Sequence, residues 1–302
     1  MDADRLGDPY PSQNLATVRR LAARLALAHA NIRTDDMKKE LHEANRLSWN
    51  AATVAHNSHK GDQAAFFRNG GSTLFPEEAG LLGDVKGLAV LHMQCNAGQD
   101  TLSIARLGAQ VTGVDISDEA ISFATQLSAQ SGIPARFERY DIVFCSYGTL
   151  CWLSDLSAWA RGVSQLLKPD GRFVFIDFHP FAMVFNPAWQ VHYDYFNDAP
   201  VPEEGVSDYV AESGDGLVRE GYETGVQDFR NPHPSFEFAW GVGQVATALA
   251  QVGLTVERLD EYPYANGWKP FEGMRDIGDR RMVPPEHMPR IPLMYSLAAR
   301  KP

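Results

Sequence analysis

VLHMQCNAGQD at residues 90–100 and VTGVDIS at residues 111–117 are the two stretches that decide the fold. In each, a short apolar run leads into a turn, which predicts a buried strand followed by a helix. The first turn contains Gly98, where the backbone can approach a ligand closely. The second strand ends at Asp115, and a carboxylate there accepts two hydrogen bonds from a ribose diol. Because doubly wound sheets bind ligands at the carboxyl ends of their strands, we expect a ligand that carries an adenosine.

Strands and helices alternate outward from this motif. Seven strands are predicted, at residues 87–93, 110–115, 135–139, 142–146, 172–177, 254–262 and 293–300. Helices are predicted between them, at residues 99–107, 117–131, 155–167 and 240–252. This alternation predicts an α/β fold, a Rossmann-like doubly wound seven-stranded sheet with helices on both faces. Only a Pro-rich loop joins the last two strands, which predicts an antiparallel last strand.

Two segments lie outside this alternation. Residues 1–80 are predicted to form an N-terminal helical cap, with good helix formers at 15–27 and a second helix from 35 to 55 that Thr34 caps. Residues 180–235 interrupt the sheet and are expected to form an inserted lid. The remaining residues, 81–179 and 236–302, are assigned to the cofactor-binding core.

One connection is physically awkward. Only Tyr140 and Asp141 separate the third and fourth predicted strands, whereas a parallel crossover needs about a dozen residues or more. Either residues 135–146 form one long strand, or a connecting segment is absent from the chain. We favour the absent segment, because every other element falls into place.

Composition excludes several classes of protein. The chain is 44% hydrophobic and 22% charged, with a net charge of -11, which excludes a disordered chain and argues against a nucleic-acid partner. No apolar run approaches the ~20 residues of a membrane span, and Met1–Tyr10 does not resemble a secretory signal. Three cysteines without a CxxC pair indicate a reducing cytoplasm. We therefore expect a cytoplasmic protein with no membrane partner.

The negative charge is concentrated in the insert. Residues 180–230 contain ten acidic residues against two arginines, and so supply -8 of the net charge. One interpretation is a solvated acidic loop. The other is a lid that attracts a cationic substrate.

At these motifs the chain resembles the class I S-adenosylmethionine-dependent methyltransferases. The resemblance covers residues 88–178 and, more loosely, residues 240–301. It includes the LLKPDGR segment at residues 166–172, which is typical before the fifth strand of this family. It implies S-adenosylmethionine as cofactor, S-adenosylhomocysteine as product and a small-molecule substrate.

The resemblance also assigns roles around the cofactor. Gln94–Gly98 would wrap its methionine part, Asp115 would hold the ribose hydroxyls and Ile116 would pack against the adenine. Ser146 and Tyr147 would line the floor beside the sulfonium. The implied cofactor-binding residues are Gln94, Cys95, Asn96, Ala97, Gly98, Gln99, Asp115, Ile116, Ser117, Ser146 and Tyr147.

The chain departs from the family pattern at three positions. The family usually has an acid at His92 and glycines at Gln94 and Asn96. Asn tolerates left-handed backbone, so Asn96 can keep the turn, but Gln94 has no evident reason. The same departures weaken an NAD-dependent oxidoreductase, because a pyrophosphate cradle needs GxGxxG and only Gly98 is left. The acid that contacts the adenine amino group is also missing.

Candidate catalytic residues follow the fourth and fifth predicted strands. His179, just after the fifth strand, is placed to act as a base or else to hydrogen-bond loop backbone. Tyr147 is the second catalytic candidate. The candidate substrate contacts are Tyr10, Trp152, His179, Tyr264 and Trp268, whose alternative roles are core packing or cover for the sheet edge.

Two further features are interpreted as structural. Cys95 is read as a small packing residue rather than a nucleophile. His56 and His59 are three residues apart, but no third ligand is near in sequence, so no metal is expected.

The resulting hypothesis is methyl transfer to a small molecule, of the type that tailors natural products. The acidic insert favours an amine acceptor and N-methylation. The alternative is O- or C-methylation with His179 as base. Apolar residues of the N-terminal helices are compatible with a homo-oligomer.

Overall fold

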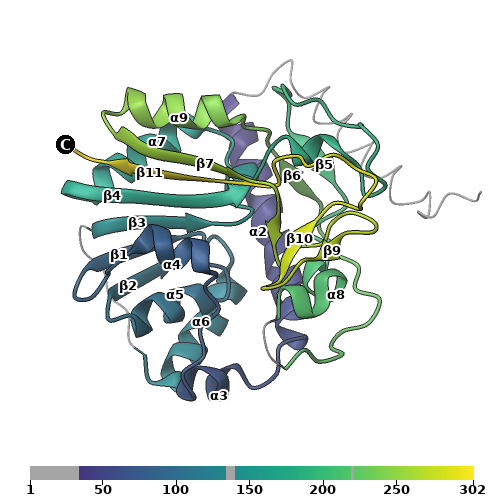
Figure 1. Ribbon diagram of the computed structural model, residues 1–302, viewed down its shortest axis with the longest axis horizontal. Helices are drawn as coiled ribbons and strands as arrows, with labels where there is room; N and C mark the ends of the chain where they lie inside the picture. Colours follow the sequence, from purple (N-terminus) through teal and green to yellow (C-terminus); the bar gives the residue numbers. More distant parts are fainter. Residues whose placement is uncertain (1–33, 134–139, 219–220) are drawn as a thin grey trace, which may run out of the picture.

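A six-stranded mixed sheet forms the centre of the protein (Figure 1). The computed structural model describes residues 34–133, 140–218 and 221–302. Its central strands are β1 (Ala89–Met93), β2 (Gln110–Val114), β3 (Tyr140–Ser146), β4 (Leu167–Phe178), β7 (Thr255–Tyr262) and β11 (Met294–Arg300). Their order is β2-β1-β3-β4-β11-β7, in which only β11 runs antiparallel to its neighbours. This confirms the predicted α/β class and the antiparallel last strand.

The strand predicted at residues 135–139, which would be the seventh of the sheet, stays a prediction. Residues 135–139 lie outside the described residues, and so does the connection that would lead from that strand to Tyr140. β3 begins at Tyr140 and pairs with β1, which places it at the centre of the sheet.

Side chains that alternate along the strands build two separate cores. Leu91, Val143 and Phe175 face one side, where helices α7 (Leu156–Leu166) and α9 (Val242–Gln251) cover them. The next residues along, such as Ile142 and Ile176, face the other side, beneath α4 (Pro76–Leu82) and α5 (Gln99–Arg106). Both faces are therefore apolar, as expected for a sheet covered on both sides.

Local capping residues fix where helices begin. The Ser117 side chain accepts a hydrogen bond from the N–H of Ala120 at 3.1 Å, so α6 (Asp118–Ser131) begins where the sequence predicts. Asp155 caps α7 in the same way. The Thr34 cap lies among residues whose side chains are not described, although α2 (Thr34–Ser58) spans the predicted second helix. The helix predicted at 15–27 lies outside the described residues.

Residues 168–171 of the LLKPDGR segment belong to β4. Pairing with β3 shifts between Leu167 and Arg172, so these residues bulge out of the ladder. Asp170 adopts φ 62, and its N–H donates to the carbonyl of Lys301 at 3.0 Å. This backbone hydrogen bond to Lys301 keeps the bulge within the sheet. The turn propensity of residues 168–171 does not by itself predict such a distant contact.

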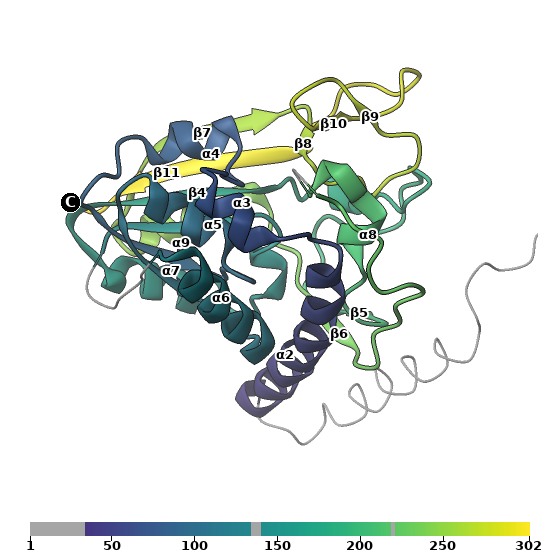
Figure 2. The same ribbon diagram turned by 90° about the horizontal axis from the view of Figure 1, so that it is seen from below.

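The remaining elements gather beyond the carboxyl ends of the parallel strands, on the side to which the arrowheads of β3 and β4 point (Figure 1). They include two strand groups, one from the insert and one from the segment between β7 and β11. These elements are η1 (Leu150–Trp152), η2 (Ala182–Val184), β5 (Val201–Glu203), α8 (Tyr209–Ser213), η3 (Gly214–Gly216), β6 (Ser235–Glu237), β8 (Ala265–Asn266), β9 (Arg275–Asp276) and β10 (Arg281–Val283). Helix α3 (Gln63–Arg68) packs instead against α6. Figure 2 shows α2 passing beneath this group, next to β5 and β6.

The boundary predicted between residues 235 and 236 falls inside β6, which pairs with β5 of the insert. The segment between β7 and β11 also touches the insert, since Arg280 Nη1 donates to the carbonyl of Gly216 at 3.3 Å. Three parts of the sequence therefore cover the strand ends: the N-terminal segment, the insert and the segment between β7 and β11.

A candidate cofactor and acceptor site

A cavity of about 1250 Å³ lies at the carboxyl ends of the parallel strands. Its floor comes from the loops after β1, β2, β3 and β4, and its walls come from α2, the insert and the segment after β7. Single ligand pockets commonly measure about 300–1,000 Å³. The cavity is thus large enough for a cofactor together with a second small molecule.

The loop after β1 turns sharply because three residues adopt left-handed backbone. These are Gln94 (φ 55), Asn96 (φ 45) and Gly98 (φ 81). A Cβ on Gly98 would lie 2.7 Å from the Cβ of Ala124, so only glycine fits there. Gln94, which sequence reasoning left unexplained, donates from Nε2 to the carbonyl of Thr149 at 2.8 Å. It therefore joins the loop after β1 to the turn after β3.

Asp115 directly follows β2 and lies beside this loop. Its carboxylate accepts hydrogen bonds from the N–H of Asn96 at 2.8 Å and from the N–H of Ser117 at 2.9 Å. Burial raises the pKa of Asp115, and these backbone donors oppose that rise. The carboxylate lines the cavity and each oxygen can accept a second hydrogen bond. Ile116, 46% exposed, lies next to it along the cavity wall.

Most residues predicted to bind the cofactor line this cavity. Those that do are Gln94, Cys95, Asn96, Gln99, Asp115, Ile116, Ser146 and Tyr147. The others support the loop from behind: Ala97 is fully buried, Gly98 packs on Ala124 and Ser117 caps α6. The structure thus brings the predicted set together, with three members in supporting positions.

Three buried polar atoms in the cavity lining have no partner among the described residues. They are Nε2 of His92, Oε1 of Gln94 and Oδ1 of Asn266. Burial lowers the pKa of His92 to about 4, so the ring is neutral at pH 7, and its Nδ1 lies 2.9 Å from Thr101 Oγ1. Buried polar atoms without partners are costly, and a polar ligand such as S-adenosylmethionine would satisfy them. The residues present therefore fit this cofactor.

Asp177 fixes the turn after β3. Its carboxylate accepts hydrogen bonds from the N–H groups of Gly148, Thr149 and Leu150 and from the Thr149 hydroxyl. Tyr147 begins this turn with φ 42. Sequence reasoning missed Asp177, although a carboxylate at the end of an otherwise apolar strand is a recognisable signal.

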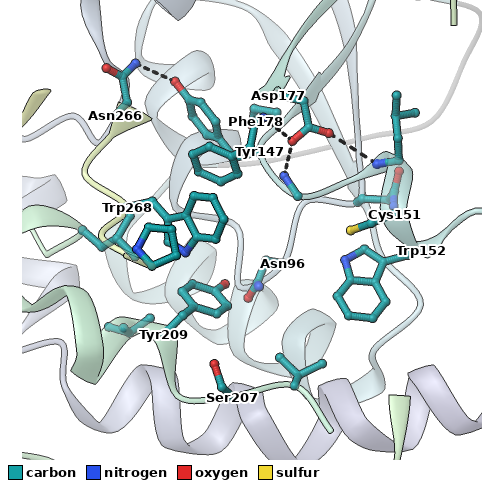
Figure 3. Close-up of a pocket in the computed structure, with 18 of the residues that line it drawn as sticks. Asn96, Tyr147, Cys151, Trp152, Asp177, Phe178, Ser207, Tyr209, Asn266 and Trp268 are labelled. Carbon is teal, nitrogen blue, oxygen red and sulfur yellow. Dashed lines mark hydrogen bonds between the residues drawn. The ribbon is translucent and has the colours of Figure 1, made fainter. Parts of the chain in front are cut away.

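The ring of Tyr147 lines the cavity, while its hydroxyl points to Asn266, whose Nδ2 donates to it at 2.9 Å (Figure 3). Burial raises the pKa of Tyr147 well above its ordinary value. A phenolate is therefore disfavoured, and the geometry suits a wall of the site rather than a base.

His179 and Tyr264 lie outside the cavity lining, which departs from their predicted roles. His179 Nε2 lies 2.9 Å from Glu261 Oε1, and its Nδ1 accepts from the N–H of Phe181 at 3.1 Å. Both ring nitrogens are thus occupied. Tyr264 donates its hydroxyl to Glu77 at 3.0 Å. Tyr10 lies outside the described residues.

Aromatic rings surround the cavity on several sides (Figure 3). Trp152 and Trp268 line it as predicted, and Trp268 packs on Phe178 with ring centroids 4.1 Å apart. Tyr209 of α8 and Trp49 of α2 add two further rings, with centroids 6.3 Å apart. Tyr209 was missed because nothing local marks a short helix inside an insert as part of a site.

His56 and His59 contact the insert. His59 Nε2 lies 2.7 Å from Asp208 Oδ2, and His56 Nε2 lies 2.9 Å from the carbonyl of Ser207. Among residues 34–133, 140–218 and 221–302, no group of three or more His, Cys, Asp or Glu is arranged to hold a metal ion. Burial raises the pKa of Cys95 to about 12, so this thiol is not activated as a nucleophile.

The acidic residues of the insert separate into different roles. Glu203 faces the cavity, Glu204 is exposed and Asp208 is buried beside His59. Glu237 of β6, which sequence reasoning did not select, also lines the cavity. In the part of the chain that the structure describes, no helix has the length and apolar character of a membrane span.

Comparison with known proteins agrees with this geometry. Residues 91–175 match the model of a methyltransferase domain family. Over 102 residues the chain is 33% identical to the ubiquinone biosynthesis O-methyltransferase of Proteus mirabilis, covering 30% of this chain and 41% of that protein. It is 29% identical over 100 residues to a putative methyltransferase, YqeM, of Bacillus subtilis, covering 28% and 40%. The chain thus spans about two fifths of the length of these curated relatives.

A solved structure shares the fold over a longer stretch. The S-adenosylmethionine-dependent methyltransferase of Mesorhizobium loti superimposes with a TM-score of 0.51 at 20% identity, over 78% of this chain and 100% of that one. Residues 91–175 therefore match a methyltransferase domain, within a chain whose fold is shared with that solved structure.

Proposed function

We propose that the protein transfers a methyl group from S-adenosylmethionine to a small molecule held in the cavity. The observation that carries this proposal is a single cavity with room for both the cofactor and an acceptor. The loop after β1 and Asp115 form its floor, and about 1250 Å³ leaves room for an acceptor beside the cofactor. When bound, the cofactor supplies a methyl group on a positively charged sulfur that is already activated for displacement.

The chain's own residues then have three tasks. Asp115 would accept hydrogen bonds from the ribose hydroxyls, and Gln94 and Asn96 would hold the methionine part. Trp152, Tyr147 and Trp268 would exclude water and orient the acceptor. Orientation and water exclusion are the main contributions that a protein makes to such an in-line displacement.

We favour a nitrogen acceptor, because the cavity wall from the insert is acidic. Glu203 and Glu237 line it, and a cationic amine would be attracted to them. O-methylation is the second candidate, supported by the names of the curated relatives from Proteus mirabilis and other bacteria. For either acceptor the base is not expected to be His179, because both of its ring nitrogens are occupied.

The test is titration calorimetry of the purified protein with S-adenosylmethionine, S-adenosylhomocysteine and NAD(H). Micromolar binding of the two adenosyl ligands, lost in Asp115→Ala, is the expected result. Binding of NAD(H) alone would contradict the proposal and favour an oxidoreductase with an unusual dinucleotide loop.

A further inference from the structure

Two carboxyl groups share one face of the ribbon formed by β5 and β6. These strands pair antiparallel, with Val201 opposite Glu237 and Glu203 opposite Ser235. Because side chains alternate across a strand, these four residues lie on the same face. Val201, Glu203 and Glu237 line the cavity, whereas Phe236, on the opposite face, is buried. The ribbon therefore turns an acidic face toward the interior of the cavity.

Neither carboxyl group is neutralised by the residues around it. Among the described residues, no side chain donates a hydrogen bond to Glu203 or Glu237, and burial raises the pKa of both. Glu237 is the more buried of the two, and its pKa reaches about 7, with the charge of Glu203 as the second cause. Ser235, on the same face, has a buried hydroxyl that also lacks a partner. Such groups are costly unless a ligand pairs with them.

In the described part of the chain, the cavity wall carries one lysine, Lys60, and one arginine, Arg280, and neither is among the charges that act on Glu203 or Glu237. The Arg280 guanidinium lies over the ring of Phe75 and donates to the carbonyl of Gly216. Lys60 of the segment after α2 is influenced by Asp100 and Asp208, and burial lowers its pKa to about 8. Neither Glu203 nor Glu237 is among the charges that act on it. The acidic face of the ribbon therefore still requires a positive charge.

Aromatic side chains stand next to the acidic face. Glu237 is followed by Phe238 and Trp240, and all three line the cavity. The N–H of Phe238 donates to the carbonyl of Cys151 at 2.7 Å, which brings this strand against η1 and its Trp152. Since η1 follows the turn at Tyr147, the acidic face lies beside Trp152, one of the residues proposed to orient the acceptor. Carboxylates together with aromatic faces are the groups that recognise an organic ammonium.

We propose that Glu203 and Glu237 bind the cationic amine of the methyl acceptor, and that Glu237 accepts the proton which this amine loses. The inference rests on the proposed methyl transfer and names its substrate class, a primary or secondary amine that carries an apolar or aromatic group. An ammonium has no lone pair, so it must lose a proton before it can attack carbon.

The step balances as follows. One proton passes from the ammonium to the Glu237 carboxylate, which leaves a neutral amine. The nitrogen lone pair then forms the new N–C bond while the C–S bond breaks and its electron pair goes to sulfur. The products are an N-methylammonium, S-adenosylhomocysteine and a protonated Glu237, which returns its proton to solvent when the product leaves.

Binding of paired amines and alcohols tests the proposal. The probes are benzylamine and 2-phenylethylamine, each compared with its alcohol, and they are titrated at pH 8 with and without saturating S-adenosylhomocysteine. We expect the amines to bind at least about tenfold more tightly than the alcohols. Glu203→Gln and Glu237→Gln should remove this preference. Glu204→Gln, an exposed neighbour in the same segment, should keep it and is the matched control.

Proton release tests the role of Glu237 separately. Calorimetry at pH 7 in two buffers of different ionisation enthalpy counts the protons released when an amine binds. Pairing with the ammonium favours the ionised form of Glu237 over its protonated form. The wild-type protein should therefore release protons when an amine binds, and Glu237→Gln should release none. The charge that acts on Glu237 is that of Glu203 from β5, and Glu237 in turn acts on Cys151 of η1, which is also influenced by Asp177. All are acids, so none of them supplies a competing cation.

Several outcomes would overturn the inference. It fails if the amines bind no better than the alcohols, which includes no binding at all, or if both Gln variants keep the preference. An amine preference without proton release would overturn the role of Glu237 as proton acceptor. Failure of S-adenosylhomocysteine to bind, in contrast, would count against the proposed methyl transfer, because the amine comparison is also made without it.

Discussion

The N–H of Asn96 donates a 2.8 Å hydrogen bond to Oδ2 of Asp115 and so joins the ends of β1 and β2. Asn96 takes a left-handed conformation at this point, which directs its backbone toward the neighbouring strand. The same carboxylate accepts from Ser117, at the start of α6. Asp115 thus fixes the loop after β1, which would hold the methionine part of the cofactor. The same carboxylate would accept hydrogen bonds from the ribose hydroxyls of the cofactor.

Asp115→Ala is expected to weaken binding of S-adenosylhomocysteine by about 100-fold, since hydrogen bonds to a charged group contribute about 1.5–3 kcal/mol each. Titration calorimetry measures this change. Asp118→Ala is the matched control, because Asp118 is exposed in the first turn of α6 and pairs with Arg46. Equal losses in the two variants would show that Asp115 has no particular part in binding.

Gly98→Ala is expected to destabilise the fold more than Gly132→Ala. Both glycines have positive φ, 81 and 78, so each substitution introduces a left-handed alanine, at a cost of about 1 kcal/mol. Only at Gly98 would the new Cβ collide, at 2.7 Å from Ala124, whereas nothing lies within 4 Å at Gly132. The collision should add about 1–3 kcal/mol. Urea unfolding of the two variants measures the difference, and equal midpoints would contradict it.

The parts of the fold that sequence predicts are those encoded by local pattern. β1, β2 and β11 are short apolar runs, and the Ser117 cap is a local hydrogen bond. Asp115 follows the same logic, because a strand end defines a position at the edge of the sheet. These features depend on neighbours in sequence, so periodicity and capping rules are sufficient to find them.

The features that the sequence left unexplained depend on contacts distant in sequence. Gln94 is explained only by Thr149, 55 residues away. Glu237 enters the site through pairing of two three-residue strands, which are too short to give a periodic signal. His179 is the converse case, because its position after β4 suggests the site, while its ring nitrogens contact Glu261 and the N–H of Phe181.

Glu237 is expected to make stability depend on pH. Its pKa is raised from an ordinary value of 4.5 to about 7, so between these values the folded protein binds more protons than the unfolded chain. Stability should therefore fall as pH rises through this window, by up to about 3 kcal/mol for this group. Glu237→Gln removes the effect, so its gain in free energy of unfolding over wild type should be larger at pH 8 than at pH 4.

Urea unfolding at both pH values measures this gain. The matched control is Glu204→Gln, which removes one charge from an exposed position in the same insert. A gain for Glu237→Gln that does not change between pH 4 and pH 8 would contradict the expected role of burial.

Asp177→Asn is expected to lower both stability and affinity for S-adenosylhomocysteine. The Asp177 carboxylate is buried and accepts from three successive N–H groups, at Gly148, Thr149 and Leu150. An amide would offer only one acceptor oxygen and turn an N–H group toward another donor, at a cost of about 2–3 kcal/mol. The turn it holds carries Tyr147, so the cavity floor should loosen as well. Asp276→Asn, an exposed carboxylate that accepts one N–H from Gly278 at 2.8 Å, should cost less than about 0.5 kcal/mol in the same urea titration.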